Sequence, residues 1–214
     1  KAGPQSPDVL VADGGGCALV YVQEGGRERV RAIAAFLMAQ PWCGPLFTSW
    51  EDIPGCFPLS LALSQHHRSP DLLLSFAWDA APNHHGLPGG AASTPLAAGV
   101  GCGTHGSLSP YEVRNVLVAA GPHFKEGRES LAPSGNVDIF PTVLRLLGLA
   151  PPEGRDGRVL AEALRDGPAP EELPVETTLH RAEASLGEAL FRQELQLSRA
   201  AGATYLDKGR ALRG

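Results

Sequence analysis

The chain has 214 residues, of which 43% are hydrophobic and 19% are charged, so it contains enough apolar material for a buried core. Its formal net charge is -5 and it has no basic run, which argues against binding of a nucleic-acid polymer through phosphate neutralisation. No apolar stretch approaches the ~18 residues of a membrane-spanning helix, so no membrane span is expected.

The four cysteines (Cys17, Cys43, Cys56 and Cys102) form no CxxC pair, so neither a thiolate zinc knuckle nor a redox pair is indicated. Their spacing does not specify a cellular compartment either. The sequence starts at Lys1 and no signal segment follows, from which we expect a processed or truncated chain.

The first half of the chain alternates strand and helix patterns. Residues 17–22 (CALVYV) form a short apolar run typical of a strand, and residues 27–40 place apolar side chains at helical spacing before Pro41. Further strands are predicted at residues 45–49, 71–78 and 114–120, and the last two are continuous apolar runs typical of strands buried on both faces. This order favours an α/β sandwich.

Residues 136–149 (NVDIFPTVLRLLGL) give the clearest helix prediction. Asp138 is expected to be the N-cap, Pro141 lies in the first turn, and Gly148 is expected to end the helix in the left-handed conformation. An inward-facing stripe is expected from four apolar residues, Ile139, Val143, Leu146 and Leu147.

The C-terminal third contains two weaker patterns. Residues 159–167 indicate a short helix at the surface, and residues 193–209 alternate apolar and polar positions around an Ala-Ala-Gly turn. The second pattern predicts a β-hairpin that closes the edge of the domain.

Residues 103–110 (GTHGSLSP) place His105 in a glycine-rich turn. Because the flanking glycines carry no side chain, the backbone is free to bend sharply and to bring an imidazole nitrogen to a shared point, as metal ligation requires. The alternative is a histidine in a surface loop that only hydrogen-bonds a neighbouring carbonyl. Ser107 and Ser109 are assigned to capping or turn formation, because no GxSxG nucleophile elbow is present.

The other candidate site residues are assigned structural roles. Asp79, His84 and His85 follow a predicted strand in a Pro- and Gly-rich loop, and we interpret them as loop or substrate-rim residues. His66 and His67 are expected to face solvent, and no function is assigned to His123 or His180. Residues 13–16 (DGGG) lack the spacing of a phosphate-binding glycine loop.

Two linked motifs carry a family resemblance. The run GTHGSLSPYEVRNVLVAAGPHFKEG, followed after a short linker by NVDIFPTVLRLLGLAPPEGRDGRVL, resembles the C-terminal part of alkaline phosphatase superfamily enzymes. It is most similar to bacterial type I phosphodiesterase and nucleotide pyrophosphatase relatives. The match covers residues 103–160 at least, and residues 71–89 and the terminal hairpin are compatible with it.

The resemblance implies a three-layer α/β/α sandwich, of which residues 1–214 form the C-terminal portion of the catalytic domain. It also implies hydrolysis of phosphoric esters (phosphodiesters, nucleotide pyrophosphates or phosphomonoesters) at a site with two zinc ions. The family's GTHG histidine binds one of these ions, and the matching position in this sequence is His105.

The sequence departs from the family pattern upstream of His105. Residues 1–102 contain no nucleophile segment, no D-x-x-x-H pair and no D-H-G pair, and the run from Asp79 to His84 is one residue too long for the second motif. We therefore expect His105 to belong to an incomplete site, with the remaining ligands in a missing N-terminal portion of the domain. The alternatives are a non-catalytic fragment that binds a ligand or partner, and a sulfatase-like ester hydrolase.

Overall fold

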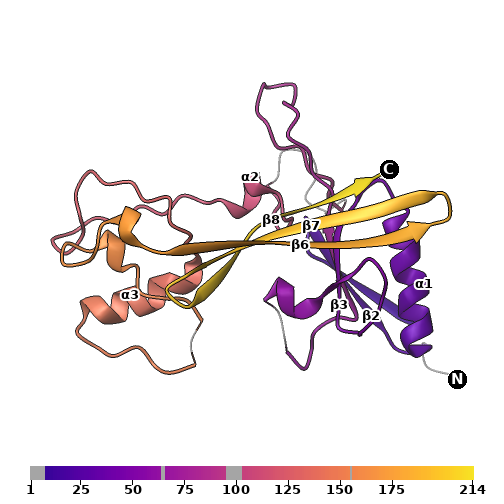
Figure 1. The fold of residues 1–214 in the computed structure, drawn as a ribbon, viewed down its shortest axis with the longest axis horizontal. Coiled ribbons are helices and arrows are strands. Elements are labelled where there is room, and N and C mark those ends of the chain that lie inside the picture. The colour runs from indigo at the N-terminus through magenta and orange to yellow at the C-terminus, as the bar shows by residue number, and fades with distance from the viewer. Residues whose placement is uncertain (1–7, 64–65, 95–102, 155) are drawn as a thin grey trace, which may run out of the picture. The chain divides into compact units, whose positions relative to one another are not determined.

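The protein was analysed as a computed structural model, which describes residues 8–63, 66–94, 103–154 and 156–214 (Figure 1). The chain divides into two compact units. Unit 1 comprises Lys1–Arg114, His180–Leu195 and Lys208–Gly214, and unit 2 comprises Asn115–Leu179 and Gln196–Asp207. The α/β class is confirmed, because both units combine helices with strands.

Unit 1 contains a five-stranded sheet in the order β1-β2-β5-β3-β4. Its strands are β1 (Val9–Asp13), β2 (Cys17–Val22), β3 (Cys43–Thr48), β4 (Phe57–Pro58) and β5 (Leu72–Phe76). The β3–β4 pair is parallel and the other three pairs are antiparallel, so the sheet is mixed. The strands predicted at residues 17–22, 45–49 and 71–78 are confirmed as β2, β3 and β5, whereas β1 and β4 were not predicted.

Helix α1 (Gly26–Met38) confirms the predicted amphipathic helix and ends two residues earlier than predicted. Its apolar stripe is buried in the same hydrophobic cluster as residues of β2, β3 and β5. Gly25, with φ of 92°, has the left-handed conformation immediately before the helix, a conformation that glycine adopts at little cost. The helix therefore covers the sheet as its apolar spacing predicts.

A second sheet has three strands in the order β6-β7-β8. These are β6 (Val175–Leu186), β7 (Ala189–Ala200) and β8 (Ala203–Arg213). The predicted hairpin is confirmed as β7 and β8. Ala201 and Gly202 join them with φ values of 45° and 85°, and two consecutive positive values are the signature of the tight type I′ turn.

Gln193 of β7 links this strand to β3 within unit 1. Its side chain is 1% exposed, accepts a hydrogen bond from Leu46 N (2.8 Å) and donates to the carbonyl oxygens of Leu46 (3.1 Å) and Gly55 (2.5 Å). The amide thus satisfies three buried backbone groups, Leu46 N, Leu46 O and Gly55 O. Arg213 of β8 also donates to backbone carbonyls of unit 1, including those of Met38 and Cys43.

Two short helices complete the regular structure of unit 1. They are the 3₁₀ helix η1 (Leu59–Ala62) and α2 (Pro110–Val113). Unit 2 contains α3 (Ile139–Leu146) and three 3₁₀ helices, η2 (Asn136–Asp138), η3 (Ala161–Ala163) and η4 (Pro170–Glu172).

Three predictions for unit 2 are wrong in detail. Residues 115–120 form no strand and are exposed, although their apolar run predicted a buried one. Helix α3 is present and Gly148 has the expected positive φ, but its predicted inward stripe is largely exposed, and the helix buries Pro141 and Thr142 instead. The short helix predicted at residues 159–167 is reduced to η3, and Leu160 and Leu164 beside it are buried.

These differences have one physical reason. The interior of unit 2 is small. It is filled by Leu160 and Leu164, by a few buried residues of β7 and β8 (Leu197, Ala200, Ala203 and Tyr205) and by a group of buried polar side chains, so among the described residues the apolar stripe of α3 stays largely exposed. The described residues form a mixed sheet and a separate three-stranded antiparallel sheet, and the expected three layers are not evident in them. No helix in the described part of the chain is long and apolar enough to cross a membrane.

We predict that Gln193→Leu destabilises the protein by at least about 2 kcal/mol, since the substitution leaves buried backbone groups without partners. Urea denaturation of the purified chain measures this change. Gln40→Leu is the matched control, because the Gln40 amide makes only an exposed contact with Phe36 O and should change stability little. Equal stability of the two variants would contradict the anchoring role of Gln193.

Candidate functional site

The His105 loop lies directly against the turn between β1 and β2 in unit 1. Gly16 N donates a hydrogen bond to His105 O at 2.7 Å, and Gly14 N bonds Cys17 O within the turn at 2.9 Å. The loop is therefore positioned through its backbone, which leaves the side chain of His105 out of the contact.

Glycines make this close approach possible. A Cβ at Gly16 would lie 2.4 Å from Ser107 N, and a Cβ at Gly106 would lie 2.9 Å from Gly14 O. Gly106 also has a φ of 110°, in the region that side chains disfavour. This geometry is consistent with the prediction that glycines permit a sharp bend at His105. The close approach also requires Gly16 of the neighbouring β1–β2 turn.

The residues after His105 fix the loop from its other side. Ser107 N donates to the Glu112 carboxylate (2.9 Å), and Leu108 N donates to Ser75 Oγ on β5 (2.9 Å). Ser109 is the N-cap of α2, since its Oγ accepts from Tyr111 N. Ser107 and Ser109 are both buried, and their capping and turn roles are confirmed.

The imidazole of His105 is exposed and has no hydrogen-bond partner among the described residues. The adjoining turn carries the side chains of Asp13 and Cys17. Asp13 accepts a short hydrogen bond from Thr94 Oγ1 and one from Gly15 N, and these bonds lower the pKa of its carboxyl group. Burial raises the pKa of the Cys17 thiol, with smaller contributions from the charges of Asp13 and Glu112.

A metal site is not assembled by the described residues alone. Among them, no three His, Cys, Asp or Glu side chains gather in a way that could hold a metal ion. A catalytic zinc ion commonly has three protein ligands, so His105 by itself does not fit a zinc site. The site with two zinc ions therefore stays a prediction. Among the described residues, His105 is the one metal ligand that the resemblance assigns.

The loop with Asp79, His84 and His85 lies outside any such group. It is closed by isolated bridges between Trp78 and Ala91 and between Pro82 and Pro88. The side chain of Asp79 accepts from Ala81 N, and the two histidine rings, both exposed, lie 3.8 Å apart. The structure gives all three side chains local contacts, as expected for loop residues.

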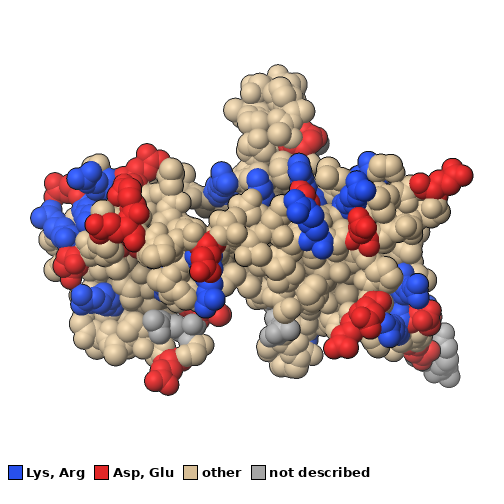
Figure 2. All heavy atoms as spheres, viewed as in Figure 1, with Lys and Arg blue, Asp and Glu red and all other residues tan. Residues whose placement is uncertain are grey.

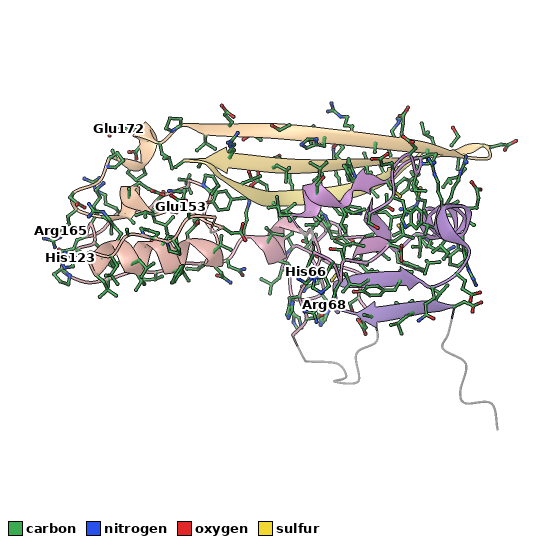
Figure 3. All side chains as sticks on the ribbon, turned by 90° about the horizontal axis from the view of Figure 1, so that it is seen from below. His66, Arg68, His123, Glu153, Arg165 and Glu172 are labelled. Atoms are coloured by element: carbon green, nitrogen blue, oxygen red, sulfur yellow. The ribbon has the colours of Figure 1, made fainter. Side chains whose placement is uncertain are left out.

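The remaining histidines also lie outside any group of metal-ligating side chains among the described residues, and Figure 3 labels His66 and His123. His66 and His67 are exposed, as predicted, with ring centroids 3.9 Å apart. His123 is exposed in unit 2, where its carbonyl accepts from Arg165 N. His180 is half-buried in β6.

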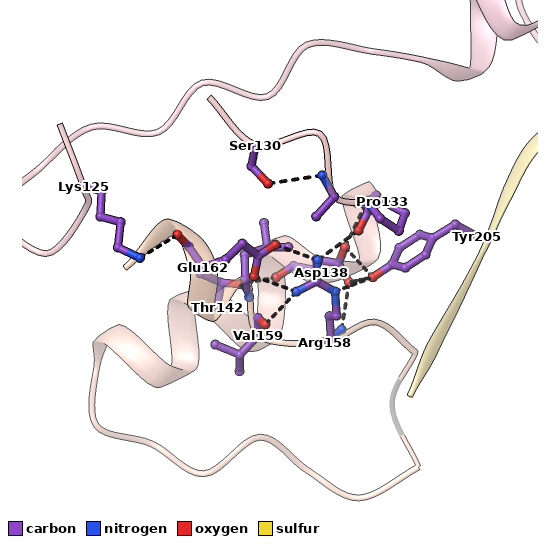
Figure 4. A network of polar contacts seen from close by, with 12 residues as sticks. Lys125, Ser130, Pro133, Asp138, Thr142, Arg158, Val159, Glu162 and Tyr205 are labelled. Atoms are coloured by element: carbon purple, nitrogen blue, oxygen red, sulfur yellow. Dashed lines mark hydrogen bonds and ion pairs between the residues drawn. The ribbon is translucent and has the colours of Figure 1, made fainter. Parts of the chain in front are cut away.

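Unit 2 contains a buried polar network that the sequence did not indicate (Figure 4). The carboxylate of Asp138 accepts hydrogen bonds from Gly135 N (2.8 Å), Arg158 N (2.7 Å) and Tyr205 Oη (3.0 and 3.1 Å). Asp138 occupies the N-cap position of α3, as predicted, but its side chain makes no cap bond to that helix. The carboxylate instead caps the preceding turn η2 and connects it to β8.

Arg158 and Glu162 extend this network as a doubly hydrogen-bonded ion pair, at 2.7 and 2.8 Å. Burial raises the pKa of Glu162, but the hydrogen bonds and charge of Arg158 outweigh it, so the net shift is downward. Among the described residues, no buried side-chain polar atom lacks a partner. A network with every group paired is suited to holding structure and leaves no group free for a ligand.

The sequence contained only a faint signal for this network. Arg158 and Glu162 are four residues apart, a spacing that favours ion pairs on a helix, but they lie around a 3₁₀ turn. The contacts of Asp138 with Arg158 and Tyr205 span 20 and 67 residues, which no local pattern encodes.

Comparison of the chain with protein-family models, with curated proteins and with solved structures finds no match. The family resemblance thus stands on the residues of the two motifs.

We predict that Gly16→Ala displaces the His105 loop and destabilises unit 1 by about 1–3 kcal/mol, because the added methyl group overlaps backbone atoms. Hydrogen exchange of the amides in residues 103–109 reports the displacement, and urea denaturation reports the stability. In Gly103→Ala, the matched control, the methyl group meets no atom within 4 Å. A control as destabilised as Gly16→Ala would refute the packing argument.

A second prediction concerns the Tyr205 phenol. Burial, together with the Asp138 charge, raises its pKa to about 12. Because the folded-state pKa exceeds the ordinary value of 10.0, the protonated phenol stabilises the folded state relative to the unfolded one. This stabilisation is present below pH 10 and is lost as the pH rises toward 12. Urea denaturation between these values should show a steeper loss for the wild-type chain than for Tyr205→Phe. If the stability of the wild-type chain and of Tyr205→Phe fell equally with pH, the raised pKa of the buried phenol would be contradicted.

Proposed function

We propose that the chain is part of a metal-dependent hydrolase of phosphoric esters and that His105 is one of its metal ligands. The observation that carries this proposal is the geometry of the GTHG loop. Its backbone is fixed against Gly14–Gly16, whereas the imidazole is exposed and unpaired among the described residues. Because the backbone of the loop is already fixed, ligation would not have to order the loop, which lowers the entropic cost of binding.

The motif resemblance supports the same assignment. Residues 103–127 and 136–160 resemble the two linked motifs of alkaline phosphatase superfamily enzymes. The proposal includes the three-layer sandwich of that family, phosphate-ester small molecules as substrates and two zinc ions as cofactors. Because the described residues do not complete a metal site, the other ligands and the nucleophile would come from an N-terminal portion of the same domain.

One observation favours the non-catalytic alternative. The described residues contain no cluster of metal-ligating side chains. A fragment of the same fold that only binds a ligand or a partner would need no such cluster. The sulfatase-like alternative differs in substrate only, so a panel of esters separates it from the others.

The test compares this chain with the polypeptide translated from the whole reading frame that encodes it. Each is assayed with zinc on p-nitrophenyl phosphate, bis-p-nitrophenyl phosphate and p-nitrophenyl sulfate. We expect phosphate-ester hydrolysis by the product of the whole reading frame, loss of this activity on chelation, and little or no activity of the 214-residue chain alone.

The decisive variant is His105→Ala in that product. Removal of a metal ligand should lower kcat/KM by at least the ~10–100-fold that loss of an outer-shell partner costs, and should lower the zinc content measured by elemental analysis. His123→Ala replaces an exposed histidine of unit 2 and should change neither quantity. Full activity and zinc content of His105→Ala would refute the assignment, and a preference for the sulfate ester would favour the sulfatase-like alternative.

A further inference from the structure

Strand β6 is an outer strand of the three-stranded sheet (Figure 1). Among the described residues, no backbone group from outside the sheet bonds residues 180–186, the part of β6 that belongs to unit 1. The opposite outer strand is partly covered, since Gly209 N of β8 donates a hydrogen bond to Leu108 O. At β6 the sheet therefore has an open edge, and an open edge offers N–H and C=O groups to a further strand.

The contacts within the sheet show which residues of β6 face this open edge. Leu190 of β7 exchanges both backbone hydrogen bonds with Gly214, so the even-numbered residues of this part of β7 bond on the side of β8. Glu194 is one of these residues, and its ion pair with Arg181 sets it opposite that residue of β6. Because opposite residues bond on the same pattern, Arg181 and Glu183 are left with N–H and C=O groups that point to the open edge.

The side chains at these two edge positions carry opposite charges. Arg181 Nε bonds the Glu194 carboxylate at 3.1 Å, and the Glu183 carboxylate lies 3.5 Å from Arg192 Nε. The side chains of Arg181 and Glu183 are still 69% and 67% exposed, so each has room for a second partner of opposite charge. Figure 2 shows basic and acidic side chains interspersed in the same way over the face that it draws.

We propose that β6 pairs antiparallel with β6 of a second copy of this chain, about a twofold axis at Ala182. In this register Arg181 of each copy lies opposite Glu183 of the other, so two ion pairs form at once. Both residues direct their backbone groups outwards, as the hydrogen-bonded positions of an antiparallel pair require. The side chain at the axis, Ala182, is small and lets the two strands approach.

The order of charges along β6 selects this register and a copy of the same strand. An axis at Arg181 or at Glu183 would set like charges opposite each other, and an axis at His180 or Ala184 would set both charges opposite uncharged residues. Charged side chains on an edge strand commonly prevent pairing. The order Arg-Ala-Glu instead makes them attractive when the partner is the same strand in the opposite direction. The charge complementarity that a partner of β6 needs is therefore present in β6 itself.

The pairing also extends a row of alternating charges that the sheet already contains. Glu194 of β7 is bonded by Arg210 of β8 at 2.7 Å and by Arg181 of β6. Hydrogen bonds from Arg210 and Arg181 hold the pKa of the Glu194 carboxyl group below its usual value, so this group is ionised at neutral pH. Glu183 of the second copy would add the next negative charge beyond Arg181, so each charge in the row would have neighbours of the opposite sign.

The proposal does not depend on the proposed function, because the pairing involves neither His105 nor a metal ion. A failed hydrolysis assay would leave the dimer proposal intact. A monomeric chain would leave the role of His105 intact.

The experiment measures the molar mass of the purified 214-residue chain by light scattering. Pairing by one strand buries less than the ~1,200–2,000 Å² of a stable interface, so we expect a rise from 22.4 kDa towards twice that value between about 10 µM and 1 mM. As the dimer forms, the amides of Arg181 and Glu183 should exchange more slowly with deuterium, because these N–H groups face the open edge.

Two single variants test the register. Arg181→Glu and Glu183→Arg each set like charges opposite each other twice, and each should weaken its own dimer about tenfold or more. An equimolar mixture of the two variants should dimerise again, because the two acidic side chains of one variant then lie opposite the two basic side chains of the other. Circular dichroism verifies that the variants fold, as expected when exposed ion pairs are broken.

Arg27→Glu is the matched control. It reverses the charge of another exposed arginine of unit 1, which pairs with Asp52 at 3.3 Å, and it should leave the dimer unchanged.

A chain that stays monomeric at all concentrations would overturn the proposal. Single variants that dimerise like the wild-type chain, or a mixture of them that stays monomeric, would overturn it as well. An open-ended series of larger oligomers, or a monomeric chain that binds a different polypeptide at β6, would have the same consequence. A dimer that is lost in each single variant, regained in their mixture and kept in Arg27→Glu supports it.

Discussion

The buried carboxylate of Asp138 is the contact on which unit 2 depends. Unit 2 buries few large apolar side chains, so hydrophobic burial alone provides little to fix its loops. Asp138 accepts hydrogen bonds from Gly135 of its own turn and from two residues that are distant in sequence, Arg158 and Tyr205. Arg158 continues the network to Glu162 and to Pro133 O. A fully paired network of this kind specifies one arrangement, because each unpaired group would be costly in a low-dielectric interior.

Unit 1 is organised differently, around a hydrophobic core with polar groups at its rim. Helix α1 and strands β2, β3 and β5 contribute the buried apolar cluster, and the Gln193 amide bonds the backbone of Leu46 in β3. The His105 loop rests on this unit through backbone contacts to Gly16. A well-packed unit with a backbone-fixed loop at its surface is a suitable support for a residue that acts on a ligand.

The two units also differ in how much apolar surface they leave open. In unit 2, residues 115–120 and much of α3 have the sequence of buried elements but are exposed. Such a conflict between local sequence and environment is expected where a surface takes part in an interaction.

The sequence by itself determined the elements whose periodicity is local. It predicted β2, β3, β5, α1, α3 and the β7–β8 hairpin, because apolar spacing, helix-ending residues and turn glycines act over a few residues. It also predicted the turn roles of Ser107 and Ser109 and the bend at His105. Only the tertiary structure decided which apolar faces are buried, that β1 and β6 join the sheets, and that Asp138 binds Arg158 and Tyr205. The physical reason is that burial and long-range hydrogen bonds depend on which segments meet in space, and residues 20 to 67 positions apart carry no joint signal along the chain.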